Sequence, residues 1–328
     1  MKSFPNAGWL SRNTMEDLKE KLERARSLSW QNFGKSVTFY LPGMFRYDGM
    51  TGKYPAVSIT GSRCALDCDH CGGKILSPMI SAESPEWLIE KCHRLEEKGN
   101  LGVLISGGCD ADGKLPWAKF LSALSEIKKK TRLHVSVHSG LIDQEAAFRL
   151  KETGIDQALI DVVGDDKTLQ DIYHVPFGIS RILSALDSLQ KAGLPTVPHI
   201  VCGLHYGKIV GEKNAIDMIS RFDVEQVVIV SLMRIPGTPA WHSEAPSAED
   251  VAEILAGARL KLPTTRISLG CARQRGNSRL DELALDAGVN RMALPSDEVI
   301  EKAESYGLNI RYQQTCCSVL EDVSKESW

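Results

Sequence analysis

The chain lacks the long apolar segments and the excess of one charge that would indicate a membrane or a nucleic acid as its main partner. No run of the 328 residues approaches the roughly 18 apolar residues of a membrane-spanning helix. The N-terminus, MKSFPNAGWLSRN, lacks the apolar core of a signal peptide. Lys and Arg number 39 against 42 Asp and Glu, a net charge of −3. We therefore expect a cytoplasmic protein that binds neither membrane nor nucleic acid.

A low-complexity linker is also missing, and composition does not shift along the chain, so one domain is expected. Its core is predicted over residues 51–295. A helix and an extended lead-in are predicted over residues 1–50. A short C-terminal extension, residues 296–328, carries the pair Cys316-Cys317.

Eight short apolar runs alternate with amphipathic helical segments in the central part of the chain. The predicted strands are 56–60, 101–106, 133–138, 157–163, 196–203, 226–233, 266–270 and 290–294. The runs are apolar throughout, as in parallel strands that are buried on both faces. Eight such units favour an α/β fold with a single parallel βα, TIM-like barrel, and an open doubly wound sheet is the alternative.

Three cysteines follow the first predicted strand directly, in the segment SITGSRCALDCDHCGG. The carboxyl ends of barrel strands carry the functional side chains, so Cys64, Cys68 and Cys71 are expected on the active face. Thiols at Cys-x3-Cys-x2-Cys spacing can hold one face of an iron–sulfur cluster, although most clusters use four cysteines. A structural zinc site, with His70 or Asp69 as its fourth ligand, is the alternative.

The chain has nine cysteines, an odd number, which favours metal-bound or catalytic thiols over disulfides in a reducing compartment. Cys92 shares a helical face with Leu88 and Leu95 and is expected in the core. For Cys202, a role as a small buried apolar residue is as well supported as a role at the active face. Cys109 and Cys271 follow the second and seventh predicted strands, on the expected active face.

The cysteine spacing in this setting resembles the radical S-adenosylmethionine superfamily. That resemblance implies a [4Fe–4S] cluster on Cys64, Cys68 and Cys71, with one iron open for S-adenosylmethionine. It also implies reductive cleavage of this cofactor to a 5′-deoxyadenosyl radical, which abstracts hydrogen from an unactivated carbon. A reducing electron donor of the ferredoxin or flavodoxin type would then be a partner.

The same resemblance implies which residues bind the cofactor. The Gly107-Gly108 turn matches the Gly-Gly-Glu segment that holds the amino group, although Cys109 stands where Glu is commoner. His70 takes the place of the aromatic residue before the third cysteine. Asp161 is placed for a ribose hydroxyl, and Gly203 lies in a glycine-rich segment near the adenosyl group.

The segments PGTPA and ISLGCAR resemble the biotin synthase branch, over roughly residues 50–295. The cysteines of the second, [2Fe–2S] cluster of biotin synthase would fall near Ile105, Ser136 and Val197, and none is cysteine. Arg273 matches the arginine beside that cluster. Arg273 and His138, at the end of the third strand, are the catalytic candidates, because an arginine there needs an anionic partner.

The segments SGGCD, DVVGD, PHIVCGL, LGCAR and ALPS resemble biotin synthase homologues that form a split, two-protein lipoyl synthase. This chain resembles the second of the two proteins, which implies sulfur insertion into an octanoyl chain. An octanoylated carrier protein and a second radical S-adenosylmethionine protein would be its partners. An auxiliary cluster would use Cys109, Cys271, Cys316 and Cys317.

Two other functions remain open from the sequence. One is a radical S-adenosylmethionine enzyme without sulfur insertion, such as a methylase, a mutase or a cofactor maturase. The other is a non-enzymatic protein that binds zinc or a cluster. The substrate follows from the resemblance alone, because no residue pattern encodes an octanoyl chain.

Overall fold

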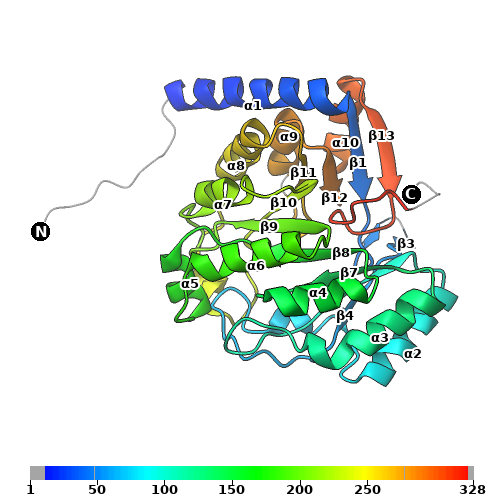
Figure 1. The fold of residues 1–328 in the computed structure, drawn as a ribbon. Coiled ribbons are helices and arrows are strands. Elements are labelled where there is room, and N and C mark those ends of the chain that lie inside the picture. Colours follow the sequence, from blue (N-terminus) through cyan, green and yellow to red (C-terminus); the bar gives the residue numbers. More distant parts are fainter. Residues whose placement is uncertain (1–11, 48, 277, 324–328) are drawn as a thin grey trace, which may run out of the picture.

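A curled sheet of eleven parallel strands frames the molecule in the computed structural model, with helices covering its outer side (Figure 1). The structure describes residues 12–47, 49–276 and 278–323. The strand order is β13-β1-β12-β11-β10-β9-β8-β7-β6-β4-β5. The predicted α/β fold with a TIM-like barrel is confirmed.

All eight predicted strands are present, as β4 and β6 to β12. The strands of the curled sheet are β1 Ser36–Tyr40, β4 Ala56–Ser58, β5 Ile80–Ser81, β6 Gly102–Ser106, β7 His134–His138, β8 Gln157–Asp161, β9 Thr196–Cys202, β10 Gln226–Ser231, β11 Arg266–Leu269, β12 Arg291–Ala293 and β13 Asn309–Gln313. A separate hairpin joins β2 Arg46–Tyr47 to β3 Met50–Thr51.

Ten α-helices and two short 3-10 helices lie between or beside the strands in the described part of the chain. They are α1 Arg12–Phe33, η1 Lys74–Leu76, α2 Pro85–Glu97, α3 Trp117–Lys130, α4 Gln144–Glu152, α5 Asp166–Tyr173, α6 Ile179–Lys191, α7 Glu212–Ile219, η2 Pro239–His242, α8 Ala248–Lys261, α9 Arg279–Asp286 and α10 Asp297–Ser305. Ser84 caps α2 by accepting a hydrogen bond from the Trp87 amide, with Pro85 in the first turn.

The N-terminal and C-terminal segments both add strands to the sheet. β1 pairs in parallel with β12 and β13, so that Thr38 lies opposite Arg291 on one side and Arg311 on the other. The sequence did not indicate these strands, because β13 is only half-buried and its hydrophobic pattern is weak. The segments predicted as extensions therefore continue the barrel sheet.

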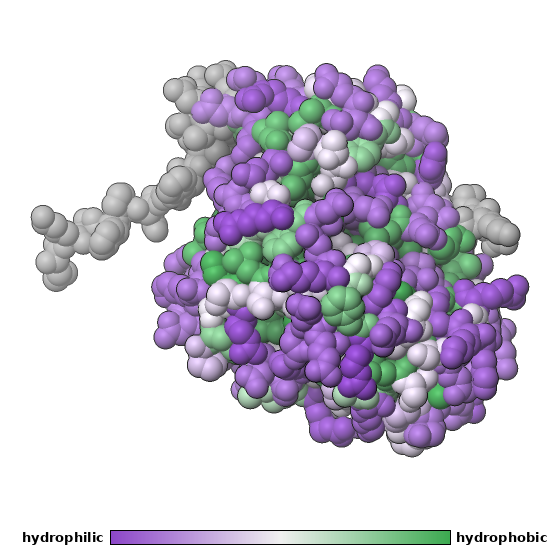
Figure 2. All heavy atoms as spheres, viewed as in Figure 1, coloured by the Kyte–Doolittle hydropathy of each residue, from purple (hydrophilic) through white to green (hydrophobic). Residues whose placement is uncertain are grey.

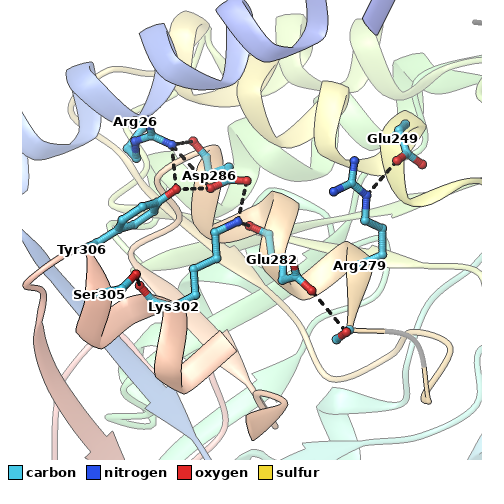
Figure 3. A network of polar contacts seen from close by, with 9 residues as sticks. Arg26, Glu249, Arg279, Glu282, Asp286, Lys302, Ser305 and Tyr306 are labelled. Carbon is cyan, nitrogen blue, oxygen red and sulfur yellow. Dashed lines mark hydrogen bonds and ion pairs between the residues drawn. The ribbon is translucent and has the colours of Figure 1, made fainter. Parts of the chain in front are cut away.

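A polar network fastens α1 to α9 and α10 (Figure 3). Arg26 Nη1 lies 3.4 Å from Asp286 Oδ1, and the Tyr306 hydroxyl donates to the same oxygen at 2.6 Å. Lys302 Nζ contacts Asp286 Oδ2 at 2.7 Å. One carboxylate thus holds three elements together, which is more than an isolated surface ion pair would achieve.

The inside of the barrel holds a small apolar region of its own, apart from the larger core between sheet and helices. Its buried members are Tyr40, Leu159, Val197, Val228, Val230, Ala293 and Cys317. Because side chains alternate along a strand, Gln157 and Asp161 face the same side as Leu159. β8 therefore presents Gln157, Leu159 and Asp161 to the interior, from the amino end to the carboxyl end.

The visible surface is largely hydrophilic, with hydrophobic side chains scattered across it (Figure 2). Among the described helices, none combines the length and the apolar character needed to cross a membrane. In the described part of the chain, eight large hydrophobic side chains are exposed. Of these, Ile75, Tyr206 and Trp241 sit in segments that adjoin the cysteine-bearing loop.

Candidate functional site

The cysteine loop, residues 59–73, leaves the carboxyl end of β4 and closes in a tight turn. The amides of Cys71 and Gly72 both donate to the Cys68 carbonyl, at 3.0 and 2.8 Å. Gly72 and Gly73 have φ of +49° and +71°, which glycine adopts without strain. The sulfurs of Cys68 and Cys71 and a ring nitrogen of His70 lie within 4.8 Å of one another. Two of the three predicted cluster ligands are thus side by side.

The Gly107-Gly108 turn lies directly against this loop. A Cβ atom on Gly108 would lie 2.0 Å from the Arg63 carbonyl oxygen and 2.6 Å from the Cys64 Cα. The Gly108 amide donates to Thr60 Oγ1 at 2.7 Å. Any side chain at position 108 would push away the backbone that carries Cys64, so the close approach requires glycine.

The thiols of the loop act on one another and on Cys109. The hydrogen bond to Cys71, followed by burial, raises the pKa of Cys68. The same bond lowers the pKa of Cys71 despite its burial, and His70 adds to the lowering. Burial, with the charges of Cys64 and Asp161, raises the pKa of Cys109 to about 12. Cys109 therefore belongs to the surroundings of the first three cysteines.

Asp69 ties the cysteine loop to three neighbouring segments. Its amide donates to the Ile172 carbonyl at 2.8 Å, and its carbonyl accepts from the Ala240 amide at 3.0 Å. Its carboxylate accepts from His174 Nε2 at 2.7 Å and from the Tyr206 hydroxyl. Burial would raise the pKa of Asp69, but these two hydrogen bonds lower it below its usual range. The carboxylate is thus already committed, which leaves His70 as the better-placed fourth zinc ligand.

A row of three polar side chains spans the carboxyl ends of β7, β8 and β9. His138 Nε2 lies 3.5 Å from Asp161 Oδ2, and Asp161 is in register with His199. Burial would raise the pKa of Asp161, but the two histidines lower it to about 2. Burial lowers the pKa of His138, whereas Asp161 raises it above its usual value. Burial lowers the pKa of His199 to about 4, so between that pH and the raised pKa of His138 the row is an ion pair beside a neutral imidazole.

Tyr173 connects this row to the cysteine loop. Its ring centroid lies 5.2 Å from that of His70. Burial raises its pKa, and the charges of Asp161 and Cys68 raise it further, so both groups are near the phenol. Asp161, Tyr173 and His199 line one pocket. Tyr173 is therefore a neighbour of both sequence-predicted residues, His70 and Asp161.

Replacing Asp161 with Asn should lower the free energy of unfolding most between pH 3.8 and 6.5, the ordinary pKa values of the two partners. The raised pKa of His138 means that the pair's contribution is lost as pH rises above this window. The lowered pKa of Asp161 means that it is lost as pH falls below it. Urea unfolding of both proteins across this pH range measures the difference. Asp187→Asn, which removes an exposed ion pair with Lys191, is the control, and a pH-independent loss in Asp161→Asn would contradict the assignment.

Gly203 shapes the loop between β9 and α7. Its φ is +75°, and a Cβ there would lie 2.6 Å from Pro246 Cγ. Both oxygens of Glu212 accept hydrogen bonds from this loop, one from the Gly203 amide and one from the Val210 amide, each at 2.7 Å. Leu204 and Val210 line the same pocket as Asp161. Gly203 thus has a backbone role next to the site.

Arg273 finds its anionic partner within the chain. Its Nε and Nη2 donate to the two carboxylate oxygens of Asp281, at 2.7 and 2.9 Å. Its other bonds go to the carbonyls of Gly270 and Leu294. Only 2% of the residue is exposed. These contacts account for its buried charge, and its catalytic role stays a prediction.

A second group of thiols, Cys271, Cys316 and Cys317, lies in the barrel interior; we call it the second thiol site. Burial raises the pKa of Cys271 to about 11, and the charge of Cys316 adds to the rise. The hydrogen bond from Cys317 lowers the pKa of Cys316. Ser318 Oγ lies 3.1 Å from Cys316 Sγ. Cys317 belongs to the apolar region of the barrel interior, and Cys271 and Cys316 pack against it, so three of the four cysteines predicted for an auxiliary cluster lie in this region, without Cys109.

Several buried polar atoms near this site have no hydrogen-bond partner among the described residues. They include Gln226 Oε1 and Thr315 Oγ1. Ser268 acts to lower the pKa of Cys317, which places its hydroxyl near that thiol. Buried unpaired polar atoms are costly, so their presence beside three thiols fits a site that takes up a polar or metallic group.

The remaining two cysteines have no place in either site. Cys92 and Cys202 are both fully buried in the main apolar core. The core position predicted for Cys92 is confirmed. For Cys202, burial favours the interpretation as a small apolar residue.

Sequence reasoning missed Tyr173, His174 and Tyr206, the residues that surround the cysteine loop. The first two belong to α5 and its end, a helix that the apolar pattern did not indicate. A signal was available, because Asp165 caps α5 by accepting from the Thr168 amide at 2.7 Å. Tyr206 has a left-handed backbone conformation, with φ of 51°, which no sequence pattern in this segment predicts.

Comparisons with known proteins agree with this site. Residues 58–208 match the family model of the Radical SAM superfamily. The chain is 24% identical to a biotin synthase of Halorhodospira halophila over 254 residues, 73% of this chain and 74% of the relative. It is 26% identical to a biotin synthase of Methylococcus capsulatus over 252 residues, 71% and 73% of the two chains.

Solved structures share the fold. The crystal structure of methylornithine synthase (PylB) has a TM-score of 0.63 and 18% identity, over 91% of this chain and 90% of the other. HydG, a maturase of the FeFe-hydrogenase, has a TM-score of 0.64 and 15% identity, over 90% and 68%. The superfamily uses a [4Fe–4S] cluster and S-adenosylmethionine, and the cysteine loop of this chain carries a cysteine motif that fits such a cluster. Residues 58–208 are thus similar to the radical S-adenosylmethionine superfamily, and biotin synthases are homologues of the chain at low identity.

Proposed function

We propose that the chain inserts sulfur into an octanoyl group carried on a lysine of a carrier protein, as the second protein of a split lipoyl synthase. The observation that carries this proposal is the second thiol site, inside the barrel and separate from the cysteine loop. A radical enzyme that only rearranges or cleaves its substrate has no need of three further thiols there. The biotin synthase homologues support sulfur chemistry by relationship.

Cys64, Cys68 and Cys71 would hold the first cluster. When bound, this cluster and S-adenosylmethionine supply a 5′-deoxyadenosyl radical, at the expense of one electron from a ferredoxin- or flavodoxin-type donor. The Gly107-Gly108 turn lets the backbone approach the cluster loop closely. Asp161, kept anionic by its histidine neighbours, is suited to accept a hydrogen bond from a ribose hydroxyl.

The second thiol site would hold a cluster that is a substrate rather than a resident cofactor. After hydrogen abstraction, the carbon radical of the octanoyl chain would attack a bridging sulfide, and a C–S bond would form. The surplus electron would pass to an iron of that cluster, which is then consumed. Apolar side chains such as Leu159, Val197 and Val228 surround this position and suit an alkyl chain.

A zinc-binding protein without enzymatic activity is the second candidate. The observation in its favour is the close group of Cys68, His70 and Cys71. It leaves the second thiol site unexplained. Bound zinc, together with no cleavage of S-adenosylmethionine under reducing conditions, would establish this candidate.

Product analysis tests the proposed function directly. The reconstituted protein is incubated anaerobically with S-adenosylmethionine, a strong reductant and a peptide that carries octanoyl-lysine. We expect 5′-deoxyadenosine and a peptide that has gained sulfur, in at most about one equivalent per chain because the donor cluster is consumed. Cleavage of S-adenosylmethionine with an unchanged peptide would instead indicate a radical enzyme that does not insert sulfur into this substrate.

A further inference from the structure

The C-terminal tail, residues 314–323, turns back from β13 and lies against the amino ends of the barrel strands. It is the red segment that passes beside β12 in Figure 1. Its start is fixed by the Lys53 amide, which donates to the Gln314 carbonyl at 2.6 Å. This end of the barrel is opposite to the carboxyl ends, where the cysteine loop lies. The tail begins at the carboxyl end of β13, beside the end of β1, and reaches Gln157 and Gln226 at the amino ends of β8 and β10, so Cys316 and Cys317 lie on this path.

Two fully buried glutamines hold the tail. Gln157 donates from Nε2 to the Ser318 carbonyl at 2.8 Å and accepts at Oε1 from the Leu320 amide at 2.9 Å. Gln226 donates from Nε2 to the Cys317 carbonyl at 2.7 Å. Both glutamines have no exposed surface, and each is the first residue of its strand, β8 or β10.

Arginines at the starts of the next two strands continue the same pattern. Arg291, the first residue of β12, donates to the carbonyls of Val319 and Leu320. Arg266, the first residue of β11, reaches the Leu320 carbonyl at 3.4 Å. The first residues of four strands, β8, β10, β11 and β12, thus bind the backbone of the tail.

The bonds of the two glutamines go to backbone atoms of the tail and leave both cysteine side chains free. The Cys317 carbonyl accepts its hydrogen bond from Gln226, while its thiol lies among the apolar residues of the barrel interior. Buried carbonyls need such partners, because an unpaired one costs on the order of 1–3 kcal/mol. The glutamines therefore fix the direction of the chain at the point where the two thiols must meet Cys271.

We propose that Gln157 and Gln226 are positioning residues for the second thiol site: they hold the tail so that Cys316 and Cys317 can bind a metal cluster together with Cys271. This inference rests on the proposed function, because it requires a second cluster. The inference goes beyond the proposed function because it assigns the assembly of that cluster to two side chains that touch neither the metal nor the substrate. Without them the tail keeps its sequence but loses the geometry of its thiols.

The test isolates the second cluster in a chain in which Cys64, Cys68 and Cys71 are replaced by alanine. Reconstituted anaerobically, this chain should hold about four iron atoms. Adding Gln157→Leu and Gln226→Leu should reduce the iron to background and remove the electron paramagnetic resonance signal of the reduced cluster. Gln190→Leu is the control, because Gln190 Oε1 also accepts from a backbone amide, but from that of Asp223 at 2.9 Å rather than from the tail.

The double glutamine variant in the chain with all its cysteines shows whether the barrel still folds. It should keep the first cluster and cleave S-adenosylmethionine as the parent does. If the two glutamine substitutions leave the iron content and the spectrum of the isolated second site unchanged, the inference is overturned while the proposed function stands. Loss of both clusters would overturn it too, because the glutamines would then serve general stability. If the chain without Cys64, Cys68 and Cys71 holds no iron, the proposed second cluster fails, and the inference fails with it.

Discussion

Replacement of Cys64, Cys68 and Cys71 by alanine will abolish the reductive cleavage of S-adenosylmethionine, while about half of the bound iron remains. The cleavage is lost because these thiols are the ligands of the cluster that transfers the electron. The iron is retained because the second thiol site lies elsewhere, in the barrel interior. Chromatographic assay of 5′-deoxyadenosine and an iron and sulfide count measure the two effects.

The control for this variant is Cys92→Ala. Cys92 is as completely buried as any cysteine of the chain, but it lies in the core between helix and sheet. Its replacement should lower stability modestly and leave both iron content and cleavage unchanged. Cleavage that persists in the variant without Cys64, Cys68 and Cys71 would show that the radical cluster is bound elsewhere.

Replacement of Cys271, Cys316 and Cys317 by alanine will separate the two halves of the proposed reaction. We expect 5′-deoxyadenosine to form at a rate near that of the parent, because the cysteine loop and the Asp161 row are untouched. The octanoyl peptide should gain no sulfur, because its donor cluster has no ligands. The iron count should fall from about eight to about four per chain.

Cys109→Ala distinguishes between the two assignments of that residue. The sequence placed Cys109 with the auxiliary ligands, whereas its electrostatic neighbours in the structure are Cys64 and Asp161. We therefore expect Cys109→Ala to keep the iron of the second thiol site, measured in the chain without the first cluster.

For the variant without Cys271, Cys316 and Cys317, a sulfurised peptide would refute the role of the second thiol site as sulfur donor.

Much of the fold followed from the sequence because buried parallel strands leave a clear mark. The eight apolar runs and the helices between them define β4 and β6 to β12 within a few residues. β1 and β13 were not predicted as strands of the sheet, because each is held in the sheet by pairing with the other. β1 lies between β12 and β13, which come more than 200 residues later in the chain. Such long-range pairing determines these strands, and no local sequence pattern encodes it.

The candidate site divides in the same way. The cysteine loop, Gly108 and Asp161 lie at strand ends, and their positions follow from strand order alone. The partners of Arg273 and Asp69 do not, because Asp281 and Tyr206 come from separate loops and helices. The convergence of Cys271 with Cys316 and Cys317 depends on the path of the tail, which buried glutamines at the opposite end of the barrel determine.

The origin of the inserted sulfur tests the central claim most directly. The protein is reconstituted with iron and sulfide enriched in heavy sulfur, freed of unbound sulfide, and incubated with S-adenosylmethionine, reductant and the octanoyl-lysine peptide. Mass spectrometry then reads the sulfur in the product. The account predicts that the peptide gains heavy sulfur from the chain's own cluster, and that the variant without Cys271, Cys316 and Cys317 transfers none. A peptide that gains no sulfur, or only sulfur of natural mass, would contradict it.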